Sequence, residues 1–253
     1  MPDALSATLL EALSSRSRRG LPMFDGLCRA GDDDGEHWFF QGGSVLRHRA
    51  ATDSVVLPTA PIAEYWPLLA GTPFEHGIDA CYTSYHRPHG YHWLFAGTLA
   101  VQYDLAAGVL LKEPASFASI FTLKGADAEF GRGVDALCPP IPVDGNYWFF
   151  RDGRMLKYHT HGMGVVANAA PVVEHWPGLA GTVFAEHVAA CHTVPGGQHW
   201  LFTGDTAAKY DSATHTVLSG PAPVADLLPA VVADLGQALT VDRGDLAPGT
   251  GRR

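Results

Sequence analysis

The chain repeats itself at a spacing of 110 residues. The matching positions include two cysteines of each half, a proline, an aromatic triplet and a Trp-Pro pair: Cys28 with Cys138, Cys81 with Cys191, Pro61 with Pro171, Trp38-Phe39-Phe40 with Trp148-Phe149-Phe150, and Trp66-Pro67 with Trp176-Pro177. After a three-residue deletion the shift becomes 107, and His92-Trp93-Leu94-Phe95 falls on His199-Trp200-Leu201-Phe202. An internal repeat of this extent predicts that the two halves have the same fold.

Each half contains two weaker copies of one unit. A unit reads as a small-residue strand with a cysteine, a turn, an aromatic strand, a glycine, a third strand and a proline-led helical segment. A period near 50 built from short strands is typical of propeller blades, because one blade cannot bury both of its faces alone. We therefore predict an all-β, four-bladed β-propeller over residues 21–235, with short helices ending its blades. The predicted blades span residues 24–71, 74–128, 130–181 and 184–230.

Unit three shows the pattern most clearly. Residues 147–150 are aromatic and favour a strand, and Asp152-Gly153 predicts a hairpin into a strand at 155–158. A glycine-rich link follows, and then Pro171 begins a short helical segment that Pro177-Gly178 stops.

These units resemble hemopexin repeats. The resemblance is carried by Ile78-Asp79-Ala80-Cys81, Tyr103-Asp104, Tyr147-Trp148-Phe149-Phe150, Trp176-Pro177-Gly178-Leu179 and Tyr210-Asp211. It covers about residues 20–235 and implies a free-standing propeller, more similar to plant seed albumins than to protease tails. Two departures stand out: no cysteine is placed to join the first and last blades, and unit four has Ala189 where the family has an inner-strand Asp.

The termini and the charge limit the classes of partner. Residues 1–20 predict a short amphipathic helix rather than a secretion signal, and residues 236–253 predict a flexible tail. No apolar run is long enough to span a bilayer, so we expect a soluble, cytoplasmic protein. The net charge of −9 makes nucleic acid and anionic membranes poor partners.

The four cysteines are the first candidate site. Cys28, Cys81, Cys138 and Cys191 occupy corresponding inner strands, and in a cytoplasmic protein we expect thiols or metal ligands before disulfides. A ring of thiolates would suit zinc or copper(I), whereas buried packing or a catalytic thiol are the alternatives. The offsets of the cysteines from the preceding aspartates differ between units, so two pairs at different depths are also possible.

Aspartates form the second candidate set. The resemblance implies that Asp25, Asp79 and Asp135 gather at one mouth of the channel, where oxygen ligands suit calcium or sodium. The alternative is that each carboxylate caps a neighbouring turn through local hydrogen bonds.

Histidines form the third set. His86 and His89 fall in a segment that unit four lacks, and His192 follows Cys191. Imidazole could ligate heme iron or a divalent metal, although histidine in a polar loop is commonly just solvated. His37, His92 and His199 each precede the tryptophan of their blade, and in the third unit Tyr147 occupies this position. We therefore interpret these histidines as residues that pack within the blades.

These candidates define three functional hypotheses. The first is a propeller that binds a small molecule or a metal ion in its channel or on one face. The second is a metabolic enzyme, such as a cyclase, lyase or redox catalyst, that uses Cys191 with His192. The third is a protein-interaction module, which the fold alone does not exclude.

Overall fold

The computed structural model describes residues 24–31, 35–84, 91–139, 145–160, 162–194 and 197–244. The predicted N-terminal helix at residues 1–20, together with His86 and His89, lies outside the described residues.

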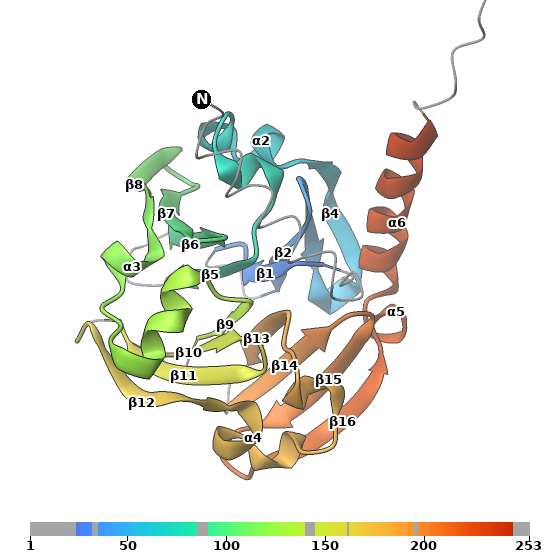
Figure 1. Cartoon of the computed structure of the whole chain (residues 1–253). Helices are drawn as coiled ribbons and strands as arrows, with labels where there is room; N and C mark the ends of the chain where they lie inside the picture. The colour runs from blue at the N-terminus through green and yellow to red at the C-terminus, as the bar shows by residue number, and fades with distance from the viewer. Residues whose placement is uncertain are drawn as a thin grey trace, which may run out of the picture.

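The described residues form four antiparallel sheets of four strands each, in which consecutive strands are neighbours. We call these sheets blades 1 to 4. Blade 1 consists of β1 (Gly26–Arg29), β2 (Glu36–Gln41), β3 (Ser44–Arg49) and β4 (Ser54–Pro61), and blade 2 of β5 (Ala80–Ser84), β6 (Tyr91–Ala96), β7 (Leu99–Asp104) and β8 (Val109–Ser116). Blade 3 consists of β9 (Ala136–Cys138), β10 (Asn146–Arg151), β11 (Arg154–His159) and β12 (Gly164–Pro171), and blade 4 of β13 (Ala190–Val194), β14 (Gln198–Thr203), β15 (Thr206–Asp211) and β16 (Thr216–Pro223). Figure 1 shows the first strand of each blade at the centre and the fourth at the periphery, which confirms the predicted four-bladed propeller.

The fourth strand of each blade is the element that the sequence pattern missed. The glycine-rich link of unit three is largely β12, which pairs with β11 across a register shift between Met155 and Tyr158. The other three blades carry a corresponding shift. Because the bulge interrupts the regular alternation of the strand and its outer position leaves it half exposed, the strand has no clear period of two.

A short helix follows the fourth strand of every blade, and in blades 1, 3 and 4 a proline precedes it, as the sequence predicts. These helices are α2 (Ile62–Tyr65), α3 (Phe117–Ile120), α4 (Val172–His175) and α5 (Val224–Leu227), and 3₁₀ turns connect the blades at Pro67–Leu69, Pro73–His76, Gly125–Arg132, Pro177–Leu179 and Val183–Ala185. A further 3₁₀ turn, Ala50–Thr52, lies between β3 and β4. Proline precedes α2, α4 and α5, where it lacks an N–H that would need a partner. Trp66 and Trp176, which end α2 and α4, are buried.

Helix α6 (Pro229–Gly244) follows blade 4 and corrects the prediction of a flexible tail over residues 236–244, which are helical, whereas residues 245–253 lie outside the described residues. Figure 1 shows α6 beside β4 of blade 1. The Asp234 carboxylate accepts hydrogen bonds from the Thr59 backbone N–H, at 2.7 Å, and from the Thr59 hydroxyl, at 2.6 Å. None of the described helices is long and apolar enough to cross a membrane.

The hydrophobic core lies between the blades in four clusters, each formed by two neighbouring blades. The cluster between blades 4 and 1 joins Phe24 and Phe39 to Phe202, and Val231 and Leu235 of α6 extend it. Each blade thus buries both of its faces against its two neighbours.

Candidate functional site

The inner strands send alternate side chains to opposite interblade interfaces. On β5, the Cys81 side chain belongs to the core between blades 1 and 2, whereas Tyr82 belongs to the core between blades 2 and 3. Successive residues of a strand point to opposite faces of the sheet. Each interface contains a pair of like side chains, and the residue type differs between neighbouring interfaces: Cys28 with Cys81, Tyr82 with Tyr147, Cys138 with Cys191, and His37 with His192.

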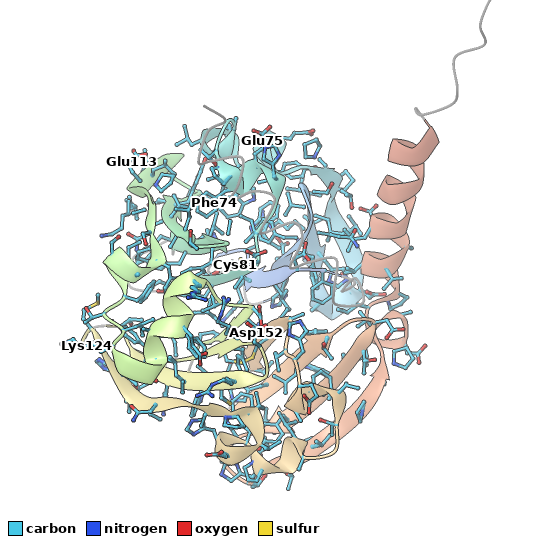
Figure 2. The ribbon with its side chains drawn as sticks, viewed as in Figure 1. Phe74, Glu75, Cys81, Glu113, Lys124 and Asp152 are labelled. Carbon is cyan, nitrogen blue, oxygen red and sulfur yellow. A yellow bond between two sulfur atoms is a disulfide. The ribbon has the colours of Figure 1, made fainter. Side chains whose placement is uncertain are left out.

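The four sulfurs do not form a single ring, which corrects the thiolate-ring prediction. Cys28 and Cys81 pack in the core between blades 1 and 2, and Cys138 and Cys191 pack in the core between blades 3 and 4. Cys81 lies on an inner strand near the centre of the molecule (Figure 2). The sulfurs are thus directed between neighbouring blades and not across the channel, so each pair is a separate site.

Cys138 and Cys191 are joined by a disulfide between β9 and β13, with their Cα atoms 5.3 Å apart. This corrects the expectation that all four cysteines are reduced. His199 lies beside the pair: its ligand nitrogen and the two sulfurs are within 4.8 Å of one another. In the part of the chain that the structure describes, no other three His, Cys, Asp or Glu side chains meet this spacing.

Hydrogen bonds determine the tautomer of His199. The Ser212 hydroxyl donates to the Gly197 carbonyl at 2.9 Å, so it accepts from His199 Nε2, at 3.0 Å. Nδ1 then carries no proton and accepts from the Thr193 hydroxyl at 3.0 Å. Burial lowers the pKa of His199 to about 4, so the ring is neutral at neutral pH, and a metal ion would take the place of the Thr193 hydroxyl at the Nδ1 lone pair.

The Cys28–Cys81 pair is reduced, and the histidine beside it, His92, carries its proton on the other ring nitrogen from His199. The Thr83 hydroxyl donates to the Arg29 carbonyl at 2.5 Å, so it accepts from His92 Nδ1, at 3.1 Å. His92 Nδ1 therefore carries a proton, and it lies 3.9 Å from the Cys28 sulfur. Burial alone would raise the pKa of Cys28, but hydrogen bonds from Cys81 and His92, with the charge of His92, lower that pKa to about 6. Burial and the neighbouring Cys28 raise the pKa of Cys81 well above its ordinary value.

His37 and His192 meet between blades 4 and 1, with their Nε2 atoms 3.3 Å apart. Burial, with the charge of Arg29, lowers the pKa of His37 to about 4 and that of His192 well below its ordinary value. His192 thus packs against another imidazole. The proposed catalytic pair of Cys191 and His192 is wrong, because the two side chains face opposite interfaces and the Cys191 sulfur is bonded to Cys138.

Asp25, Asp79 and Asp135 each hydrogen-bond to a hairpin turn of their own blade. In each case one carboxylate oxygen accepts a hydrogen bond from a backbone N–H in the turn between the second and third strands of that blade. The donors are Gly42 for Asp25, at 2.7 Å, Gly97 for Asp79, at 2.6 Å, and Asp152 for Asp135, at 2.7 Å. In blade 4 the position is Ala189, which has no such acceptor. The geometry supports the turn-capping alternative, and the calcium or sodium site at the channel mouth stays a prediction.

A shallow cavity of about 530 Å³ lies between the turns of blades 3 and 4 and was not predicted from the sequence. Asp152, Glu186, His187 and Asp205 line it, and His187 Nδ1 lies 3.5 Å from the Asp135 carboxylate. Figure 2 labels Asp152 near the centre of the view.

The closed ring of four antiparallel blades, each ending in a short helix, defines the chain as a hemopexin-like four-bladed propeller. No family model matches the chain. Over 130 residues it is 28% identical to Albumin-2 of Lathyrus sativus, a match that covers 50% of this chain and 56% of that protein. The chain thus spans about half the length of the curated relative it matches.

Two solved plant proteins illustrate the structural likeness. The hemopexin-fold protein CP4 from cow pea has a TM-score of 0.73 at 21% identity, covering 84% of this chain and 98% of that chain. A plant lectin with two metal binding sites from Cicer arietinum has a TM-score of 0.74 at 19% identity, covering 83% and 97%. At these identities the likeness establishes the fold and nothing further.

Proposed function

We propose that this protein is a metal-binding propeller that holds a thiophilic ion such as Zn²⁺ between blades 3 and 4, through Cys138, Cys191 and His199. The observation that carries the proposal is that these three ligand atoms lie within 4.8 Å of one another. Two thiolates and an imidazole are the ligands of many zinc sites, and a small molecule or water would complete a tetrahedral set. In this proposal the disulfide is the oxidised form, and a thiol reductant supplies the two electrons and two protons that break the S–S bond. The metal ion then binds the two sulfurs as thiolates and releases the thiol protons to solvent.

The surroundings of the three side chains support this proposal. All three are buried, so a bound ion would be shielded from exchange with solvent. His199 is neutral, and its Nε2–H donates to Ser212, which is the outer hydrogen bond that orients many metal-binding histidines. The Cicer arietinum protein of the same fold has two metal binding sites. A reducing compartment such as the cytoplasm, which we also propose as the location, would keep the thiols available.

The test is metal retention by the full chain. The protein is reduced, mixed with Zn²⁺, desalted and analysed for zinc. We expect about one tightly held zinc per chain, none after treatment with an oxidant that restores the disulfide, and none in Cys138→Ser. His199→Gln should weaken retention on the order of 10-fold or more, because it removes one ligand.

His92→Gln is the matched control, because His92 is the repeat equivalent of His199 and lies beside the other cysteine pair. It should leave zinc retention at Cys138 unchanged. Reduced protein that holds no zinc, or equal retention in wild type and in the Cys138→Ser variant, would refute the proposal.

A further inference from the structure

In the first half of the chain, Cys28 and Cys81 occupy the repeat positions that the disulfide-bonded Cys138 and Cys191 occupy in the second half. The 110-residue shift places Cys28 on Cys138 and Cys81 on Cys191. Strands β1 and β5 are neighbours, as β9 and β13 are. The two sulfurs are already hydrogen-bonded to each other, yet both cysteines are free. The backbone arrangement that closes one disulfide is therefore repeated at a pair that is reduced.

The environment of this pair differs from that of the disulfide in one respect that matters for reactivity. At Cys28 the imidazole presents an N–H, because the Thr83 hydroxyl is committed to the Arg29 carbonyl. At the second pair the proton is on His199 Nε2, which donates to Ser212 on the far side of the ring. A donor beside a sulfur stabilises the thiolate, which is the nucleophilic form of cysteine.

We propose that Cys28 and Cys81 form a peroxide-reactive pair that closes into a second interblade disulfide. The Cys28 thiolate attacks one oxygen of hydrogen peroxide, so that an S–O bond forms, the O–O bond breaks and hydroxide leaves. The Cys81 sulfur then attacks the Cys28 sulfur, forming the S–S bond and breaking the S–O bond, and the hydroxyl leaves with the Cys81 proton as water. In total, two thiols lose two electrons, and one peroxide is reduced to two waters, the second arising when the hydroxide takes up a proton.

The burial of Cys28 and Cys81 limits which oxidants can reach their sulfur atoms. Cys28 and Cys81 are each 3% exposed and pack against Trp38, Trp66 and Leu94. Hydrogen peroxide is close to water in size and uncharged, whereas a glutathione-sized disulfide would have to open the interface between blades 1 and 2. The contact between the two sulfurs also makes closure of the disulfide faster than a second oxidation of Cys28.

The experiment treats the full chain, with its Cys138–Cys191 disulfide intact, with one equivalent of hydrogen peroxide. Remaining thiols are then alkylated under denaturing conditions, and the disulfides are mapped by mass spectrometry of peptides. We expect the free-thiol count to fall from two to none, with a peptide linking Cys28 to Cys81. Oxidised glutathione at the same concentration should leave both thiols free.

Single variants identify the roles within the pair. In Cys81→Ser, Cys28 should stop at sulfenic acid and proceed to sulfinic acid with excess peroxide, because no second sulfur is in reach. In Cys28→Ser, Cys81 should react at least about tenfold more slowly, because burial, which the variant retains, raises its pKa and keeps its thiolate fraction small. Two alkylatable thiols in peroxide-treated wild type, or equal reactivity of the two variants, would overturn the proposal. The wild-type mapping needs no variant to fold and does not depend on zinc binding.

Discussion

At the residue scale, the alternation of side chains on the inner strands decides which chemistry each residue can take part in. Cys191 and His192 are adjacent in the chain, yet one contacts blade 3 and the other contacts blade 1. Residues separated by 53 positions, such as Cys138 and Cys191, are bonded instead. A nucleophile and its base must therefore be sought across an interface and not along the strand.

A prediction at this scale concerns Asp79. Gly97 has a φ of +55°, and its N–H donates to the Asp79 carboxylate. Asp79→Ala leaves that N–H without its acceptor, and we expect a loss of about 1–3 kcal/mol in the free energy of unfolding, measured by urea denaturation. Ala189→Asp is the matched control, because it introduces the carboxylate that blade 4 lacks and should not destabilise the protein.

The calcium alternative gives a different result in the same assay. If these carboxylates instead form a cation site, the wild-type melting temperature rises with added Ca²⁺ and Asp79→Ala abolishes the rise. That outcome would replace hairpin capping as the main role of Asp79.

At the element scale, α6 joins the first and last blades, which no cysteine is placed to join. It leaves blade 4, lies along β4 of blade 1, and its Asp234 accepts two hydrogen bonds from Thr59. Val231 and Leu235, four residues apart on one face of the helix, are buried in the core between blades 4 and 1. The helix therefore connects the first and last blades by apolar burial and a partly buried polar contact.

We predict that Leu235→Ala lowers the free energy of unfolding by about 2–5 kcal/mol, because it removes a fully buried side chain from this core. Chemical denaturation followed by tryptophan fluorescence measures the change. Ala233→Ser, on the exposed face of the same helix, should change stability by less than about 0.5 kcal/mol. Equal effects of the two substitutions would show that α6 does not hold the ring closed.

At the scale of the whole molecule, the four interfaces have an approximate two-fold order that the repeat imposes. A cysteine pair alternates with a pair of rings: Tyr82 and Tyr147 between blades 2 and 3, and His37 and His192 between blades 4 and 1. The interface between blades 4 and 1, which closes the propeller, therefore contains two histidines that can take up protons. The equivalent interface between blades 2 and 3 contains two tyrosines instead.

Closure should therefore be sensitive to acid. The pKa of His37 is about 4 in the folded protein and that of His192 is also lowered, so below the unfolded value of 6.5 the unfolded chain binds more protons. Stability is then full above pH 6.5 and falls as the pH drops toward 4, by up to about 1.4 kcal/mol per pH unit for each histidine.

Thermal unfolding at pH 7.5, 5.5 and 4.5 measures this dependence. His199, whose pKa is also about 4, adds to the slope in the same direction. The double variant His37→Tyr, His192→Tyr copies the pair at the opposite interface and should reduce the slope between pH 6.5 and 4. An unchanged slope in that variant would place the acid sensitivity elsewhere.

The sequence by itself determined the repeat, the number of blades, the aromatic second strands and the proline-led helices, because these depend on local propensity and on a period that survives in the residues. It also placed the four cysteines on equivalent inner strands. Only the tertiary structure decided that β1 meets β5 and β9 meets β13, so that the sulfurs form two pairs between neighbouring blades. The tautomer of the histidine beside each pair depends on hydrogen bonds of Thr83 and Ser212 to backbone carbonyls, and such contacts leave no spacing in the sequence from which they can be inferred.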